Sequence, residues 1–288
     1  MSAIENLLNL ISIEKISENK FRASVQELGW KRVFGGLIVA QSIVAACKTV
    51  KNKHLHSLHS YFLRAGDPQL TMKYEVNTLR EGRSFAQRIV SAHQNDKLIF
   101  YMIASFQKKE KGLEHQENIP HNIAAPESLK TEIEILDDVF KNNPDNLRDT
   151  RHRGRAIEFR PINPRDIAEP REEDPMQLLW LKTSKKMNID SIMSQALLAY
   201  ASDYTILDTA LMPHGISIFQ KDIQVASLDH SIWFHNSSFD VNDWILYSQR
   251  SPKTSGNRGF ATGNLYSRKG SLIATVAQEG MIRKLPTI

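Results

Sequence analysis

The chain has 288 residues, of which 41% are hydrophobic and 24% are charged, and its formal net charge is +5 at pH 7. This composition is that of a globular protein, and the length is sufficient for one large domain or two smaller ones. An internal disulfide is excluded because Cys47 is the single cysteine. A membrane-spanning helix is not expected, since the longest apolar run, residues 37–47, is well short of the ~20 residues required.

The first residues carry no targeting signal that we can recognise. Residues 1–15 have the leucine and isoleucine spacing of an amphipathic helix, without the basic start and cleavage site of a secretory signal. We therefore expect a cytoplasmic protein. The sequence contains no Cys-x-x-Cys, no His-Glu-x-x-His and no glycine-rich phosphate loop, so no metal site and no cofactor are predicted.

The first half of the chain predicts one buried helix followed by an antiparallel meander. After a strand at 20–27, Gly35 and Gly36 open a helix over 33–47 that is apolar on nearly all sides, as expected of a helix wrapped inside a sheet. Segments with period-two alternation follow at 58–63, 70–80, 84–92 and 98–107, separated by turn residues.

From residue 108 to about 173 the alternation fails, prolines recur and a basic patch occupies residues 148–155. We predict a long linker with one short helix near 132–141, followed by strands at 156–161 and 176–183. The rest repeats the order of the first half, with a buried helix at 194–211 and strands at 223–234, 244–251, 258–267 and 272–283.

This repetition predicts an α+β fold with two units, each a buried helix wrapped by a curved antiparallel sheet. We assign residues 1–110 to an N-terminal unit, 111–155 to the linker and 156–288 to a C-terminal unit. Local matches support the duplication: Ser57-Leu-His-Ser-Tyr-Phe resembles Ser227-Leu-Asp-His-Ser-Ile-Trp-Phe, and Arg83-Ser-Phe-Ala resembles Arg258-Gly-Phe-Ala.

Two polar residues stand out against this apolar framework. Aligning the last apolar strands of the two halves pairs Ala104 with Gln278, and a duplicated fold needs no glutamine there. Asp203 lies within the apolar stripe of the helix predicted at 194–211, where desolvation makes a carboxylate a better base. The alternative is that Ser202 or Asp203 caps a shorter helix beginning at Tyr204.

Six separated blocks of the sequence, in order, resemble the acyl-CoA thioesterases of the type II group, which are double-hotdog enzymes of bacteria and peroxisomes. The similarity covers most of the chain and is weakest at about residues 108–190. The blocks are Val33-Phe-Gly-Gly-Leu-Ile-Val-Ala-Gln, His59-Ser-Tyr-Phe-Leu-Arg-Ala-Gly-Asp, Ile99-Phe-Tyr-Met-Ile-Ala-Ser-Phe-Gln, Tyr200-Ala-Ser-Asp, Ser227-Leu-Asp-His-Ser-Ile-Trp-Phe-His and Gln278-Glu-Gly.

The resemblance implies a double-hotdog fold and hydrolysis of fatty acyl-CoA to free fatty acid and CoA, by direct attack of an activated water. Family members hold that water with an aspartate, a serine or threonine and a glutamine, which correspond here to Asp203, Ser227 and Gln278. A homodimer or homotetramer is also implied. The C-terminal sequence Leu285-Pro-Thr-Ile differs from the Ser-Lys-Leu type of peroxisomal signal, which agrees with a cytoplasmic location.

Other interpretations of these residues remain open from sequence. Ser227 could bond a neighbouring backbone group, and Gln278 could link two strands. A Ser-His-Asp triad is not favoured, because no Gly-x-Ser-x-Gly motif occurs and strand neighbours such as Asp229 and His230 point to opposite faces. The patch at 148–155 could meet CoA phosphates, nucleic acid or only water, and we expect a solvated linker face.

Three rival functions follow from the same observations. A non-catalytic acyl-CoA binding or regulatory protein of this fold would lack the Asp, Ser and Gln set. A hotdog hydratase needs an Asp and His pair, for which His214 is poorly placed beyond Pro213. Nucleic-acid binding through residues 148–155 is not expected, since that patch lacks interleaved aromatic residues.

Overall fold

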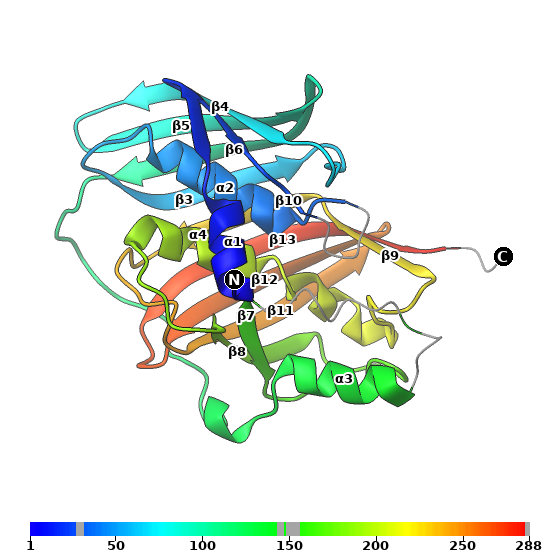
Figure 1. Ribbon diagram of the computed structural model, residues 1–288. Helices are drawn as coiled ribbons and strands as arrows, with labels where there is room; N and C mark the ends of the chain where they lie inside the picture. Colours follow the sequence, from blue (N-terminus) through cyan, green and yellow to red (C-terminus); the bar gives the residue numbers. More distant parts are fainter. Residues whose placement is uncertain (27–31, 143–146, 148–155, 286–288) are drawn as a thin grey trace.

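The computed structural model describes residues 1–26, 32–142, 147 and 156–285 of the chain (Figure 1). Its described strands form one 13-stranded sheet in the order β1-β2-β4-β5-β6-β3-β10-β13-β12-β11-β8-β7, and β9 also pairs with β13. The strands are β1 (Glu14–Ser17), β2 (Lys20–Ala23), β3 (His54–Phe62), β4 (Met72–Glu81), β5 (Phe85–Gln94), β6 (Lys97–Gln107), β7 (Ile157–Pro161), β8 (Met176–Thr183), β9 (Ile223–Ser227), β10 (Asp229–Phe234), β11 (Ile245–Ser255), β12 (Arg258–Ser267) and β13 (Leu272–Lys284).

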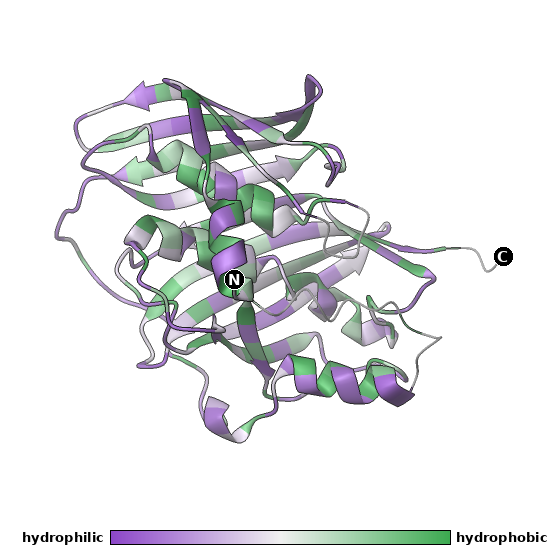
Figure 2. Ribbon diagram, in the orientation of Figure 1, coloured by the Kyte–Doolittle hydropathy of each residue, from purple (hydrophilic) through white to green (hydrophobic). Residues whose placement is uncertain are grey.

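The helices divide into buried and peripheral ones. The α-helices of the described residues are α1 (Ala3–Ile11), α2 (Gly35–Cys47), α3 (Glu132–Asn142) and α4 (Ser191–Ser202), and the 3-10 helices include η3 (Ile206–Ala210) and η4 (Met212–His214). Every residue of α2 after Gly35 is buried, and its ribbon is largely hydrophobic in Figure 2. By contrast, α3 buries only Leu136 and Phe140 and alternates in hydropathy, as a surface helix does.

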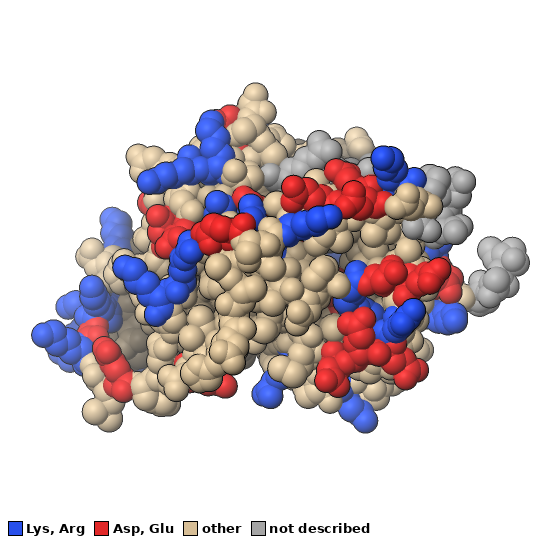
Figure 3. Space-filling model, turned by 90° about the horizontal axis from the view of Figure 1, so that it is seen from below, with Lys and Arg blue, Asp and Glu red and all other residues tan. Residues whose placement is uncertain are grey.

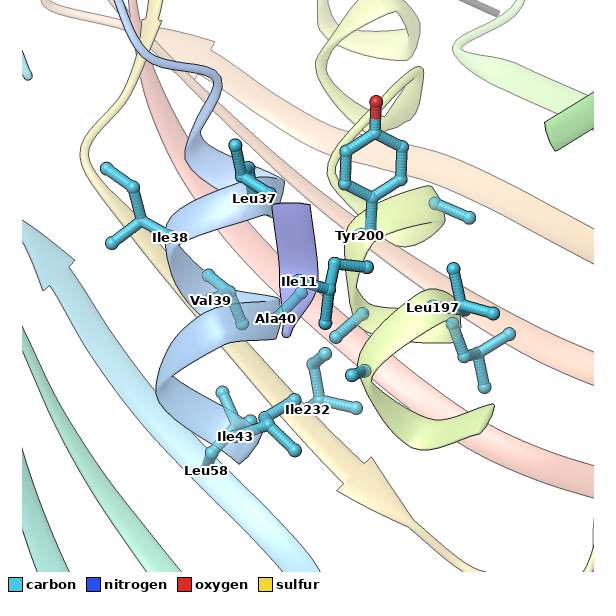
Figure 4. Close-up of a cluster of buried hydrophobic side chains, with 14 of the residues drawn as sticks. Ile11, Leu37, Ile38, Val39, Ala40, Ile43, Leu58, Leu197, Tyr200 and Ile232 are labelled. Carbon is cyan, nitrogen blue, oxygen red and sulfur yellow. The ribbon is translucent and has the colours of Figure 1, made fainter. Parts of the chain in front are cut away.

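The core lies where α2 and α4 pack side by side (Figure 4). The helices run in opposite directions, so the first turn of α2 lies beside the last turn of α4. Gly36 permits this approach, because a Cβ atom there would lie 2.6 Å from the carbonyl oxygen of Tyr200. The side chains between the helices and the sheet include Leu37, Ile43, Leu58, Leu197 and Ile232.

The two halves of the sheet join at β3 and β10, where His59 pairs with Ser231 in antiparallel register. In Figure 1 the strands β3 to β6 curve around α2, and β10 to β13 lie against α4. One helix held by each half of a continuous curved antiparallel sheet is the double-hotdog arrangement, so the predicted α+β fold class is confirmed. The exact division at residues 110 and 155 stays a prediction.

Most predicted elements occur close to their expected positions, with additions at the N-terminus. The amphipathic helix ends at Ile11, and residues 14–17 form β1, an edge strand that pairs with β2 and was not predicted. The strand predicted at 20–27 is β2, which ends at Ala23. The basic patch at 148–155 lies outside the described residues.

Matching irregularities in the two halves fix which positions are equivalent. The β5–β6 pair changes register after Ala92, which faces Phe100, and the β12–β13 pair changes register after Leu265, which faces Ala274. Counting four residues onward from Phe100 and from Ala274 aligns Ala104 with Gln278, as the sequence alignment proposed. The Arg-x-Phe-Ala match is wrong by two positions, because Ala86 lies six residues before Ala92 whereas Ala261 lies four before Leu265.

Candidate active site

Asp203 lies at the carboxyl end of α4 rather than inside a longer helix. The prediction of one helix over 194–211 is wrong, because α4 ends at Ser202 and Asp203 is its C-terminal cap. The last turn tightens, with the Tyr204 amide donating to Ala201, and Thr205 adopts a non-helical backbone before η3 begins. The alternative that Ser202 or Asp203 caps the start of a helix at Tyr204 is also wrong, because the next helix, η3, begins at Ile206. Asp203 nevertheless remains buried, with 7% of its surface exposed.

The carboxylate bonds to the other two predicted site residues. Ser227 Oγ donates to Asp203 Oδ1 over 3.1 Å, and Gln278 Nε2 donates to the same oxygen over 2.8 Å. The Gln278 amide also lies 2.9 Å from Ser227 Oγ, to which it donates. The structure thus brings together three side chains that are far apart in sequence, at the ends of α4 and β9 and within β13. Gln278 does link strands, since it bonds Ser227 at the end of β9 and His230 in β10, but it also bonds Asp203.

A strand irregularity points Ser227 toward Asp203. The strand predicted at 223–234 is divided into β9 and β10, which both pair with β13. Ser227 faces Gly280 and Ser231 faces Ala277. An advance of four residues from β9 to β10 is therefore matched by only three residues in β13. This is a β-bulge, which bends the strand and redirects side chains, and bulges commonly lie beside active sites.

The amino end of α2 forms the opposite wall of this cluster. A Cβ atom on Gly35 would lie 2.8 Å from Asp203 Oδ2, so this second carboxylate oxygen faces the first turn of α2. The first backbone N–H groups of a helix have no partner within the helix, and this end carries partial positive charge. The first half of the chain therefore contributes the helix amino end, while the second half contributes the Asp, Ser and Gln side chains.

We predict that Gly35→Ala lowers kcat/KM for acyl-CoA by about tenfold, because the new methyl group would displace Asp203 Oδ2 and the ring of Phe62, 2.9 Å away. Gly35 does not have a positive φ, so the added methyl group, not backbone strain, causes the effect. Steady-state kinetics would measure it, with Gly112→Ala as the control, since a Cβ there meets nothing within 4 Å. Equal kinetics for both variants would contradict the close approach.

A pocket of about 280 Å³ opens onto this cluster. Asp203 and Ser227 line it together with Gly35, and apolar walls come from Ile38, Phe62, Leu207 and Val225. Arg32 and Arg64 also line the pocket and add positive charge. The volume and mixed lining fit a small-molecule or acyl-group site.

The sequence analysis missed one buried partner of the cluster, His230. Its side chain is completely buried, with Nδ1 in contact with Gln278 Oε1 and Nε2 3.0 Å from Ser202 Oγ. Burial lowers the pKa of His230 below its ordinary value, partly offset by Asp203, so the ring is neutral near pH 7. The sequence could have indicated this residue, because the equivalent position of the first half is the apolar Leu58.

Other histidine, cysteine and aspartate side chains do not join the cluster. His56 bonds Ser105, as a satisfied strand histidine does, and burial raises the pKa of the Cys47 thiol to about 12. Asp229 bonds the Glu279 amide instead of His230, so these residues do not form a triad with Ser227. Within the described ranges, no group of three or more His, Cys, Asp or Glu is placed to hold a metal ion.

Basic and acidic side chains lie next to one another on the face shown in Figure 3, and Arg268 pairs with Glu127 at 2.6 Å. None of the described helices is long and apolar enough to cross a membrane.

The sheet contains two hotdog units, and a hydrogen-bonded cluster of Asp, Ser and Gln lies beside a pocket at their junction. These features define a double-hotdog protein of the thioesterase type. The acyl-CoA thioesterase family matches residues 165–281, and its N-terminal domain matches residues 26–107. The chain belongs to the acyl-CoA thioesterase family.

Individual relatives support this assignment over nearly the whole chain. Acyl-CoA thioesterase 2 of Haemophilus influenzae is 41% identical and covers 97% of this chain and 98% of its own length. Human acyl-coenzyme A thioesterase 8 is 38% identical over 97% of this chain and 89% of its own. The crystal structure of acyl-CoA thioesterase II TesB2 from Mycobacterium marinum is 33% identical, covers 98% of this chain and 99% of its own, and superposes with a TM-score of 0.79.

Proposed function

We propose that this chain hydrolyses fatty acyl-CoA to free fatty acid and CoA by direct attack of a water molecule that Asp203 activates, with Ser227 and Gln278 holding the Asp203 carboxylate in place. The observation that carries the mechanism is the unequal environment of the two oxygens of Asp203. Oδ1 accepts bonds from Ser227 and Gln278, whereas Oδ2 faces Gly35, and both Asp203 and Gly35 line the pocket. A carboxylate fixed by one oxygen and presenting the other to substrate is arranged as a general base.

The reaction proceeds through a tetrahedral intermediate. Asp203 Oδ2 takes one proton from water as the water oxygen bonds to the thioester carbon, and the carbonyl electron pair moves to its oxygen. The free N–H groups at the amino end of α2, by Gly35 and Gly36, stabilise this oxyanion. The carbonyl re-forms as the C–S bond breaks, and the proton on Asp203 passes to the CoA sulfur.

The pocket lining supports an acyl-CoA substrate. Ile38, Phe62 and Val225 provide an apolar wall for an acyl chain, and Arg64 provides positive charge for the phosphates of CoA. The relatives named as acyl-CoA thioesterases support the same substrate class. A cytoplasmic location and a homodimer or homotetramer stay predictions from sequence. No observation favours the non-catalytic alternative.

We predict that the purified chain releases CoA from palmitoyl-CoA, measured with a thiol-trapping dye. Direct attack by water leaves no acyl group on the protein, so the mass of protein quenched during turnover should be unchanged. In H₂¹⁸O, each fatty acid formed in a single turnover should carry one ¹⁸O atom. Binding of palmitoyl-CoA without thiol release would favour the non-catalytic alternative, and an acylated protein would contradict direct attack.

A further inference from the structure

We propose that His230 is a positioning residue for the hydrolysis proposed above: its Nδ1–H holds the Gln278 amide with its NH₂ group toward Asp203 and Ser227. The inference concerns a buried side chain that does not line the pocket. It rests on the proposed function only for its kinetic consequence, because the hydrogen-bond arrangement stands on its own.

The Gln278 side chain has two orientations that differ only by exchange of its oxygen and nitrogen. In the orientation present, Nε2 donates to Asp203 Oδ1 at 2.8 Å and to Ser227 Oγ at 2.9 Å, and Oε1 contacts His230 Nδ1. In the exchanged orientation, the amide oxygen would face the carboxylate oxygen, and two acceptors would meet without a proton between them. The amide NH₂ group would then face His230.

The protonation of His230 selects between these orientations. Its ring is buried and neutral, so it carries one N–H, which must lie on Nδ1 if Gln278 Oε1 is to have a donor. Nε2 is then an acceptor that faces the Ser202 hydroxyl, 3.0 Å away, whose one proton has a second acceptor at the same distance in the Ala199 carbonyl oxygen. Asp203 and Asp229 are the nearby charged groups, and both favour the protonated ring, but burial outweighs them and lowers the pKa of His230. The Nδ1–H form is therefore the neutral form that gives Gln278 Oε1 a donor.

The first half of the chain provides an internal comparison. Leu58 faces Ala104 there across β3 and β6. In the second half, Ser231 faces Ala277, so His230 and Gln278 occupy the corresponding pair of positions across β10 and β13. Two apolar residues stand where the active half has a histidine and a glutamine. The histidine is therefore not required by the sheet, and it occurs together with the glutamine that it bonds.

The test compares His230→Leu, which adopts the residue of the first half, with His230→Asn, whose amide can still donate from about the place of Nδ1. With palmitoyl-CoA we expect His230→Leu to lower kcat by about tenfold with little change in KM, and His230→Asn to recover most of the loss. In a Gln278→Leu background, His230→Leu should cause no further loss, since its partner is already absent. Circular dichroism and thermal unfolding would establish that the variants are folded.

A spectroscopic readout is independent of activity. In ¹⁵N-histidine-labelled protein, the His230 ring should show a protonated Nδ1 and an unprotonated Nε2, and Gln278→Leu should shift the Nδ1 signal. Equal loss in His230→Leu and His230→Asn, additive loss in the double variant, or a proton on Nε2 would overturn the inference. If the wild type releases no thiol, the proposed function fails, while the tautomer measurement still tests the His230–Gln278 bond.

Discussion

Asp203→Asn is expected to lower kcat for palmitoyl-CoA by about 10²–10⁴-fold, the contribution typical of a positioned general base. Asparagine keeps the shape of the side chain, and its Oδ1 can still accept from Ser227 and Gln278. Its NH₂ group would then replace Oδ2 beside Gly35. The variant therefore removes the group that accepts the water proton and leaves the pocket and the hydrogen bonds in place.

A matched control lies at the other end of the same helix. Asp190 caps the start of α4 by accepting from the Met193 amide, and asparagine is an equally good N-cap residue. Asp190→Asn makes the same change in charge and shape without touching the cluster, so it should retain wild-type kcat. Both variants should unfold at nearly the wild-type temperature. Equal activity of Asp203→Asn and wild type would remove Asp203 from the chemistry.

The sequence predicted the architecture because the fold depends on patterns that the chain carries twice. Period-two alternation marked β4, β5 and β6, and the same pattern recurs in β11, β12 and β13. The helix that begins at Gly35 was also predicted from sequence, because a helix that is buried on all sides is a largely apolar segment. In these elements the hydrophobic periodicity of the sequence matches the surface that the fold buries. The elements could therefore be predicted from the sequence.

The parts that sequence reasoning missed depend on contacts across the chain. The end of α4 at Ser202 follows from the tight last turn and from bonds that hold Asp203 in place, which helical periodicity cannot detect. The bulge between Ser227 and Ser231 depends on the register with β13. His230 was set aside because a triad with Asp229 was unlikely to form. That reasoning was right about Asp229 but overlooked the residue across the strand, Gln278.

Among the described residues, the equivalent place in the first half holds a different set of polar side chains. Arg88 faces Ala104 there, as Ala261 faces Gln278 in the second half. The guanidinium of Arg88 is buried, pairs with Glu81 at 2.5 Å and donates to Thr49. A cation held by these bonds occupies the region where the second half has its carboxylate and amide. Duplication supplied the sheet and the helix amino end twice, and the polar residues then diverged.

Gln278→Leu is the second variant expected to have a large effect, with kcat reduced by about 10²-fold. Its amide donates to both Asp203 and Ser227, and the bond to the charged Asp203 is worth about 1.5–3 kcal/mol. Leucine has a similar volume but offers no donor, so Asp203 Oδ1 keeps only the bond from Ser227 and the carboxylate can rotate away from the pocket. KM should change little, because Gln278 is fully buried and does not line the pocket.

Gln195→Leu provides the matched control for this glutamine. Gln195 is also buried, and its amide donates to the Leu55 carbonyl oxygen at 2.9 Å, outside the cluster. Both variants bury an aliphatic side chain in place of an amide and should lose stability by a similar amount, but only Gln278→Leu should lose kcat. Rates and unfolding temperatures measured on the same preparations would separate the two effects. A loss of kcat in both variants, in proportion to lost stability, would mean that Gln278 acts through the fold and not through Asp203.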